Sequence, residues 1–385
     1  MNLRKENNQL NILNAIFDKQ VATRANLSRM LGISKPTIAY HLTDLLNLGL
    51  VQEVGEGKPS KAGGRKPMLL RFNKEYGDIV SIDLNYSDPT FAIGNLNGEI
   101  YNQFTVKMSE QTTASKRLEL IKNAIQVLLD SKNTNEENLI CIAIASPGIF
   151  YSSKKYSLVN PQFREWFKID LANLISEEFH VDTILENDVN MAAYGEFNSI
   201  TKENENIRNM IYVSCGKGIG SGLILNSKLY EGSFNSAGEI FNFINSSGLA
   251  SGQNLEKRIS IDGLISSLPK INDFKTVVKE YNRENPMVID RIRQIGSELG
   301  SSISNIANLL SLDTVIIGGE YSVFSDILLE EIEKVLKSYC LFPPALLPST
   351  LGRYAGVMGL FSVARQRFFE SIVKKEDNEI IENER

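Results

Sequence analysis

The sequence has few of the residues that bind metals or form disulfides. Its 385 residues include three cysteines, Cys141, Cys215 and Cys340, and two histidines, His41 and His180. The cysteines are scattered, odd in number and without metal-ligand spacing, which predicts buried thiols in a reducing compartment and excludes a disulfide framework. Two histidines are too few for a histidine-based metal site to be expected.

Long apolar runs are also missing. No stretch approaches the roughly 20 apolar residues that a membrane-spanning helix needs, and the polar start of the chain has no signal-peptide pattern. These absences predict a cytoplasmic protein that does not engage a membrane. The length of 385 residues predicts two or three domains with ample hydrophobic core.

Charge is distributed unevenly along the chain. Residues 1–70 contain ten Lys and Arg and five Asp and Glu, a net charge of +5, whereas the whole chain carries −5. The remainder therefore carries −10. A basic module on an acidic body predicts a polyanionic partner at one end only.

Three short helices are predicted in the basic module. The second helix begins at Thr23, a good N-cap residue, and ends at Gly32, which tolerates positive φ. The third begins at Ser34, has Pro36 in its first turn and ends at Gly49. The apolar residues that recur at helical spacing are Leu10, Leu13, Ile16 and Phe17, then Leu27, Met30 and Leu31, then Ile38, Leu42, Leu45 and Leu46. This order is that of a helix-turn-helix.

A β-hairpin is predicted directly after the third helix. Its strands are residues 50–54 and 68–72, and the segment between them is rich in glycine and basic residues, as in the wing of a winged helix. The predicted DNA-binding residues lie on the second and third helices and on the wing, and are Arg24, Ser34, Lys35, Thr37, Tyr40, His41, Lys58, Lys61, Arg65 and Lys66. The alternative, a helical bundle with ordinary solvated charges, is less favoured because capping, spacing and the basic wing agree.

After residue 76 the chain alternates strands and helices, and one pattern occurs twice. The predicted strands are residues 79–84, 90–96, 99–104 and 139–145, then 210–214, 222–225, 228–230 and 315–317. Two copies of an α/β unit predict two lobes with a ligand cleft between them. We expect domains at 1–75, 76–200 and 201–373, with the C-terminal helix returning to the first lobe, and a charged tail at 374–385 that frays.

Five motifs in order give the chain a family resemblance. They are Glu186-Asn-Asp-Val-Asn190, Ser214-Cys-Gly-Lys-Gly-Ile-Gly-Ser-Gly222, Ala237-Gly-Glu-Ile240, Val315-Ile-Ile-Gly-Gly319 and Ala355-Gly-Val-Met-Gly359. With them the chain resembles the ROK family (repressors, open reading frames, kinases), in particular its sugar-responsive repressors of the xylose type. The resemblance implies a winged helix-turn-helix followed by the two-lobed α/β actin-like ATPase/sugar kinase fold, which is RNase H-like.

The phosphate-binding side of a kinase is degenerate. ROK kinases have Asp-x-Gly-Gly-Thr in the first hairpin, where this chain has Asp83-Leu-Asn-Tyr-Ser87. Asn85 and Tyr86 replace both glycines, and a tyrosine would crowd a phosphate. Asp83 is interpreted as the cap of a strand end.

The second glycine hairpin is better preserved, with alternating glycines at 216, 218, 220 and 222. It is compatible equally with a nucleotide and with a tight hairpin against the cleft. Gly318 and Gly319 could approach an adenosine, but Glu320 follows them, and a two-glycine turn after a buried strand is common. We therefore predict a protein that is not an enzyme and has no cofactor.

The sugar-binding side of the family is better preserved. Asp188 aligns with the catalytic base of the kinases, Asn187 with a sugar ligand, and Glu239 with the sugar-binding Glu. The resemblance also implies that Glu256 and Gln162 bind the sugar, although Gln162 stands where the kinases have Asn, and Trp166 is a candidate wall of the site. The alternative is that each is a hydrogen-bonded surface or turn residue.

The zinc element of the family is absent. Family members have a His and then a cysteine cluster after the sugar-binding Glu, whereas this chain has Asn242 and the cysteine-free segment 245–252. A closed zinc site needs thiolates or imidazoles, so we predict no metal. The loss leaves the identity of the sugar open.

Three hypotheses for function follow. The favoured one is a sugar-responsive repressor of carbohydrate-utilisation genes, such as those of xylose metabolism, which binds an inverted-repeat operator as a homodimer or tetramer and takes a monosaccharide effector. The alternative is an active ATP-dependent sugar kinase with an attached DNA-binding module. The third is a DNA-binding or scaffolding protein without an effector.

Overall fold

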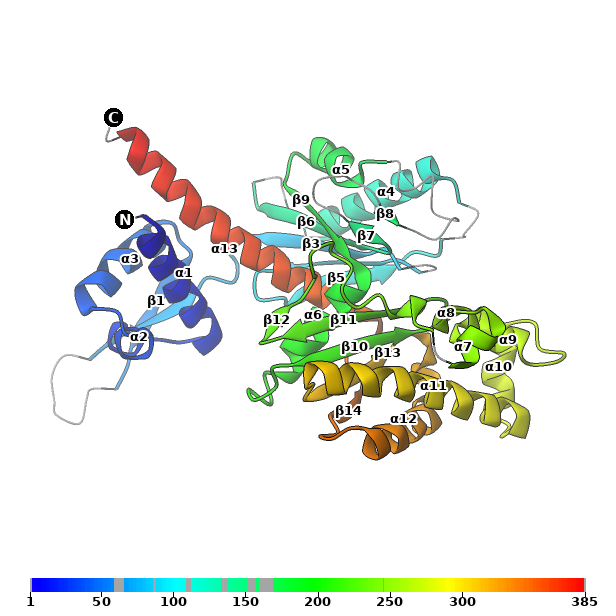
Figure 1. The fold of residues 1–385 in the computed structure, drawn as a ribbon. Helices are drawn as coiled ribbons and strands as arrows, with labels where there is room; N and C mark the ends of the chain where they lie inside the picture. Colours follow the sequence, from blue (N-terminus) through cyan, green and yellow to red (C-terminus); the bar gives the residue numbers. More distant parts are fainter. Residues whose placement is uncertain are drawn as a thin grey trace.

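Two five-stranded sheets form the body of the protein, and a small helical module lies to one side of them (Figure 1). The computed structural model describes residues 2–58, 66–85, 88–108, 112–132, 134, 137–150, 157–158, 169–244 and 246–383. The C-terminal helix α13 runs from between the two sheets out to the N-terminal module (Figure 1).

The first sheet has the strand order β5-β4-β3-β6-β9. Strands β3, β4 and β5 form an antiparallel meander, and β6 and β9 add in parallel beside β3. All residues of β3 and β4 are buried, whereas β5 at the edge alternates half-buried and exposed positions, as their places in the sheet require. The strands are Asp78–Asp83 (β3), Thr90–Asn95 (β4), Ile100–Thr105 (β5), Leu139–Ser146 (β6) and Thr183–Asn187 (β9).

The second sheet repeats this order as β12-β11-β10-β13-β14, with the same antiparallel and parallel pairings. Its strands are Met210–Cys215 (β10), Ile219–Leu225 (β11), Lys228–Leu229 (β12), Thr314–Gly318 (β13) and Ala345–Pro348 (β14). The predicted repeat of one α/β unit and the two-lobed fold are therefore confirmed. A further two-stranded pair is formed by Ile149–Phe150 (β7) and Ser157–Leu158 (β8).

Helices cover the outer face of each sheet. Apolar residues of α4 (Ala114–Lys132) and α5 (Leu171–Phe179) form one core with β3 and β6. Those of α11 (Pro286–Leu310) and α12 (Ser325–Tyr339) form a larger core with β10 and β13. The remaining helices of this lobe are α7 (Ser246–Ser251), α8 (Leu255–Ile259), α9 (Ile261–Ser266), α10 (Phe274–Tyr281) and the short 3₁₀ turns η3 (Ile240–Asn242), η4 (Glu320–Phe324) and η5 (Gly352–Tyr354).

Two helices, α6 (Asp188–Ile200) and α13 (Ala355–Asn383), pack between the sheets. Helix α13 contacts β3 and β6, and α6 contacts β10 and β11. Their crossing is glycine-lined, because a Cβ on Gly195 would overlap the carbonyl of Ala355 and one on Gly359 would overlap the carbonyl of Met191. The two helices can therefore approach at backbone distance.

The charged C-terminal segment differs from its prediction. The sequence predicted a frayed tail from residue 374, but α13 continues as a helix to Asn383. Residues 374–383 contain neither glycine nor proline and are rich in Lys and Glu, which favour helix, so nothing in the sequence ends the helix there.

The N-terminal module has the predicted order. It consists of α1 (Asn2–Lys19), α2 (Arg24–Leu31), α3 (Lys35–Asn47) and the antiparallel strands β1 (Val51–Glu56) and β2 (Met68–Phe72). Its buried core includes Ile16, Leu27, Ile38 and Leu42, and this core is continuous with α13 through Phe369. None of the helices in the described ranges combines the length and apolar character that crossing a bilayer requires.

Candidate functional site

Helix α3 presents the predicted DNA-reading surface. The hydroxyl of Ser34 accepts the backbone N–H of Thr37 (3.3 Å) and lies 2.7 Å from the hydroxyl of Thr37, so both side chains form the N-terminal cap of the helix. Thr23 caps α2 in the same way through the N–H of Asn26 (3.2 Å). The caps fix where each helix begins and hence which residues face outward.

Of the four predicted residues on α3, two are exposed, Thr37 is half-buried and one is buried. Lys35 is exposed, and so is Tyr40, which keeps 52% of its surface. His41 is 2% exposed, so the prediction that it lies on the DNA-facing surface was wrong. It stands three residues after Ile38 and four before Leu45, both buried, which puts it on the core stripe of the helix.

The basic residues around the β1–β2 hairpin form exposed ion pairs. Arg24 lies 3.4 Å from Glu53, and Lys66 lies 3.6 Å from Glu56. Such exposed pairs are weak and can be exchanged for contacts with phosphate. Lys58 is exposed, whereas the predicted residues Lys61 and Arg65 lie outside the described residues.

A second candidate site lies where β9 of the first sheet meets α6. Asn187 ends β9 and caps α6, because its Oδ1 accepts the N–H of Asn190 (2.9 Å). Its Nδ2 donates to the carbonyl of Gly148 (2.9 Å), just beyond β6. The predicted sugar ligand Asn187 therefore ties together two segments of the first lobe and the first turn of α6.

Two of the predicted carboxyl groups, those of Asp188 and Glu256, act on the ionisation of a third, Glu239. Burial raises the pKa of Glu239 to about 7, and the negative charges of Asp188 and Glu256 add to this rise. Burial likewise raises the pKa of Asp188 to about 6, although backbone N–H groups at the start of α6 oppose the rise. The structure thus brings together Asp188, Glu239 and Glu256, three of the residues that the sequence assigned to one site.

Close backbone packing positions the two glutamates. Gly238, before Glu239, has φ +90°, and its carbonyl accepts the hydroxyl of Ser221 (2.6 Å) on β11. The Oε2 of Glu256 accepts the N–H of Ile219 (3.0 Å) at the start of the same strand. The carboxylate of Glu256 and the backbone before Glu239 are therefore both anchored to β11.

The remaining residues predicted near this site are only partly described. Gln162 and Trp166, and Tyr86 of the first hairpin, lie outside the described residues. Asp83 is buried at the end of β3, where burial and the charge of Asp188 raise its pKa well above the ordinary range. Its carboxylate accepts the N–H of Asn85, which agrees with the strand-end cap that the sequence suggested.

The glycine hairpin β10–β11 packs against side chains of the protein itself. Glycines 220 and 222 lie against Val189 and Ala193 of α6. At the turn, the carboxylate of Glu320 fills the space beside Gly216 and accepts the backbone N–H of Lys217. Two interpretations were open for this hairpin, and the packing favours the tight hairpin.

A junction between α13 and the N-terminal module was not predicted. Phe369 of α13 makes edge contacts with Phe17 and Phe72, at centroid distances of 6.2 and 5.3 Å. The guanidinium of Arg365 lies 4.0 Å from the centroid of Phe17. Two residues further along α13, Arg367 forms an ion pair with Glu186, the residue before Asn187. The available sequence signal was the aromatic pair at 368–369 in a helix that also carries buried arginine.

Family models match both parts of the chain. The model described as the ROK family matches residues 79–241 and 246–367, and a helix-turn-helix model described as bacterial regulatory protein, arsR family, matches residues 6–53. The xylose repressor of Staphylococcus xylosus is 30% identical over 80% of this chain and 81% of its own length. The xylose repressor of Bacillus subtilis (strain 168) is 28% identical over 96% of this chain and 97% of its own length.

Solved structures share the fold. A ROK family transcriptional regulator, described as a homologue of the E. coli MLC protein, superposes with a TM-score of 0.78 at 19% identity and covers 96% of this chain and 98% of that one. A ROK family glucokinase from Streptomyces griseus, in complex with glucose and AMPPNP, superposes with a TM-score of 0.63 at 20% identity and covers 75% of this chain and all of that one. The kinase matches less of the chain, whereas the regulator extends over nearly all of it.

The raised pKa of Glu239 predicts a stability that falls as pH rises. In the unfolded chain this carboxyl ionises near its ordinary value of 4.5, whereas in the folded protein it keeps its proton up to about pH 7. The folded state therefore binds more protons between these values, and the free energy of unfolding decreases with rising pH across this window. We expect Glu239→Gln to flatten the decrease in urea midpoint, followed by circular dichroism, whereas the exposed control Glu203→Gln keeps it. An unchanged slope in Glu239→Gln would contradict the assignment.

Proposed function

Because the chain belongs to the ROK family, we propose that it is a sugar-responsive repressor of carbohydrate-utilisation genes. The observation that carries the proposal is the meeting of Asn187, Asp188, Glu239 and Glu256 at the start of α6, a helix packed against the one that contacts the DNA-reading module. The curated relatives named xylose repressors support both halves of the proposal.

The effector is a monosaccharide held by the carboxyl and amide groups of this site. A polyol presents several hydroxyl donors at fixed angles, and carboxylates accept such donors in several directions. Partly buried acceptors that lack donors are costly, which gives the sugar its binding energy. The relatives favour xylose or another pentose as the first candidate. Gln162 remains a candidate ligand from the sequence alone.

The DNA partner is a double-stranded operator, read by Lys35, Thr37 and Tyr40 of α3, with Arg24, Ser34, Lys58, Lys61, Arg65 and Lys66 as further candidate contacts. Helix-turn-helix proteins place the start of the second helix of the motif in the major groove, and a two-fold dimer then matches an inverted repeat. The protein acts as a homodimer, or as a tetramer built from two such dimers, in the cytoplasm where bacterial operators are accessible. The arsR-type module supports this assignment.

A chain of contacts links the sugar site to the DNA-reading module. Helix α6, which begins at the sugar site, crosses α13 at the glycine contacts, and Arg367 of α13 pairs with Glu186 beside the site. From there α13 continues to Phe369, which packs on Phe17 and Phe72 of the module. A sugar that shifts the start of α6 therefore acts on α13, and α13 turns the module with it.

ATP, the phosphoryl donor of the family's kinases, does not fit the phosphate-binding hairpins of this chain. The carboxylate of Glu320 takes the backbone N–H of Lys217 and the space beside Gly216 that an incoming phosphate would need. The negative charge of a carboxylate at that position would also repel phosphate. These contacts support a protein that binds sugar without phosphorylating it, and weigh against the alternative of an active kinase.

Removal of Asp188 tests the sugar site. We expect Asp188→Ala to bind the DNA upstream of its own gene within about threefold of wild type, but to lose release by sugar, because only the effector contact is removed. The measurement is a mobility shift across a panel of pentoses, hexoses and amino sugars. Asp290→Ala, at an exposed position of α11, is the matched control and should respond as wild type does. Release of the Asp188→Ala complex by the same sugar would reject the site, and wild-type DNA that no sugar releases would favour the effector-independent hypothesis.

Removal of the Arg367–Glu186 ion pair tests the coupling. We expect Arg367→Gln to bind the sugar within about threefold of wild type by calorimetry while its operator complex becomes markedly harder to release, because coupling energies of this kind are typically about 1–3 kcal/mol. Lys334→Gln, which removes an exposed pair on α12, is the control and should change neither property. Normal release from Arg367→Gln would place the coupling elsewhere.

An ATPase assay tests the alternative function. With the effector sugar and Mg²⁺-ATP present, we expect no sugar-dependent formation of ADP, because Glu320 holds the phosphate position of the second hairpin. A ROK glucokinase assayed in parallel shows that turnover would be detected. ADP formation that depends on the sugar and rises in proportion to the concentration of this protein would establish the kinase function instead.

A further inference from the structure

A cavity lies on the α11 side of the second lobe, apart from the sugar site. Its volume is about 370 Å³, at the lower end of the range of small-molecule sites. Its walls come from the η3 segment, α8 and α11, and are formed by Asn242, Phe243, Ile244, Leu255, Arg258, Ser301, Ser302 and Asn305. Alternate residues of β10 belong to the core with α11 and to the core with α6, so these helices lie on opposite faces of the sheet.

Arg258, in the wall of this cavity, is 9% exposed and incompletely paired. Its Nε donates to Oε2 of Glu298 (2.8 Å), and its Nη1 donates to the carbonyl of Gln253 (2.8 Å). Its Nη2 is buried and meets no hydrogen-bond acceptor among the described residues. A buried guanidinium nitrogen without an acceptor is costly and favours any ligand that supplies one.

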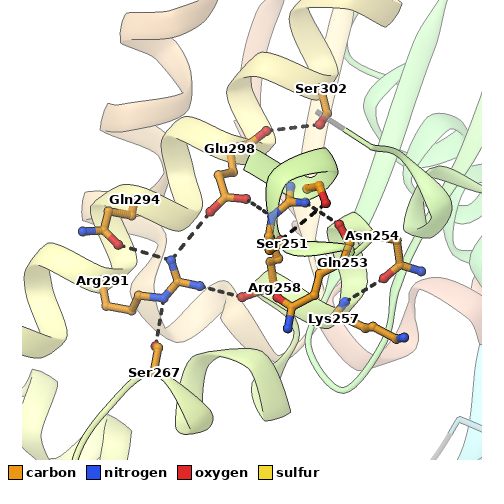
Figure 2. A network of polar contacts seen from close by, with 11 residues as sticks. Ser251, Gln253, Asn254, Lys257, Arg258, Ser267, Arg291, Gln294, Glu298 and Ser302 are labelled. Carbon is orange, nitrogen blue, oxygen red and sulfur yellow. Dashed lines mark hydrogen bonds and ion pairs between the residues drawn. The ribbon is translucent and has the colours of Figure 1, made fainter. Parts of the chain in front are cut away.

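The charge in this wall is unbalanced. Figure 2 shows that Arg291 reaches the same Glu298 that Arg258 binds, and the two atoms Arg291 Nη1 and Glu298 Oε1 lie 3.7 Å apart. Arg291 also donates to the hydroxyl of Ser267 (2.9 Å) and to the carbonyl of Arg258. Two largely buried guanidinium groups thus share the single carboxylate of Glu298 beside the cavity.

We infer that this cavity is a second ligand site, which binds the oxyanion group of a small metabolite. A phosphate or carboxylate has the charge and the acceptor atoms that Arg258 lacks, and planar guanidinium groups bind both. Asn242, Ser301 and Asn305 add side-chain donors to the polar part of the wall. Ile244 and Leu255 supply an apolar wall for a carbon skeleton.

The position of the cavity predicts what its ligand does. Asn242 lies in the 3₁₀ turn directly after Glu239, and Leu255 directly precedes Glu256. The N–H of Leu255 donates to the carbonyl of Phe243 (2.8 Å), and Asn254 Nδ2 donates to Asn242 Oδ1 (3.1 Å). An anion held against these residues therefore modulates the sugar site through the wall that the two sites share. This modulation rests on the proposed function, whereas the binding of the anion is independent of it.

Calorimetry on the full-length chain, without DNA or sugar, tests the anion site. The probes are inorganic phosphate and acetate, with the ionic strength kept constant by chloride. We expect saturable binding of at least one probe: phosphate binding would indicate a phosphate ester, and acetate binding a carboxylic acid. Arg258→Met should weaken it at least about tenfold. The exposed control Arg353→Met loses the same charge and should bind as wild type.

A second variant keeps the test valid if Arg258→Met does not fold. Asn305→Leu fills part of the cavity from an exposed position of α11 and leaves the Arg258–Glu298 pair intact, so it should also reduce binding at least about tenfold. Absence of saturable binding for both probes would overturn the inference. So would binding that both Asn305→Leu and a folded Arg258→Met retain. Because no sugar or DNA is present, these outcomes are independent of whether the protein is a sugar-responsive repressor.

Discussion

Helices α6 and α13 cross so closely that each presents a glycine to the backbone of the other. Gly195 faces the carbonyl of Ala355, and Gly359 faces that of Met191. A methyl group on either glycine would push the helices apart, because packed interiors leave no room to absorb it. The crossing lies between the two sheets, so it fixes their separation as well as the start of α6, where Asp188 lies. It also fixes the direction in which α13 leaves the body toward the DNA-reading module.

The second constraint is electrostatic. Asp188, Glu239 and Glu256 are partly withdrawn from water, and this burial raises the pKa values of all three carboxyl groups, while the charges of Asp188 and Glu256 raise that of Glu239 further. A group of acids is retained in such a place only if something offsets its cost, and a polyol that donates several hydrogen bonds is one such partner. On the other side of the same lobe the imbalance has the opposite sign, since Arg258 and Arg291 share Glu298. The two sites that we propose would therefore take ligands of different charge, although one segment of chain forms a wall of each.

Local patterns predicted most of the fold, and long-range contacts account for what they missed. Periodicity and capping identified α2 and α3, and the repeated strand pattern identified four of the five strands in each sheet, because these signals are carried by neighbouring residues. The strand pattern missed β9 and β14. His41 was wrongly assigned to the DNA-facing surface. The apolar stripe of α3 was read as four residues that begin at Ile38, although position 41 lies on the same buried face of the helix. The carboxylate site needed the family resemblance, since Asp188, Glu239 and Glu256 are far apart in sequence. The junction of Phe369 with Phe17 joins residues more than 350 positions apart, and no local pattern could pair them.

A regulator derived from a kinase fold must keep the substrate bound and unreacted. In this chain the carboxylate of Glu320 lies beside Gly216 of the second glycine hairpin, while Asp188 and Glu239, the carboxyl groups of the proposed sugar site, remain. Binding energy that a kinase would spend on the transition state is then available for conformational change. A ligand shifts an equilibrium only by the difference in its affinity for the two states, so the sugar must meet groups whose spacing changes with state. Asn187 satisfies this requirement, because it ends a strand of the first sheet, bonds the carbonyl of Gly148 and caps a helix that packs on the second sheet. In the function that we propose, a rotation between the lobes would alter these contacts, and α13 would carry the change to the DNA-reading module.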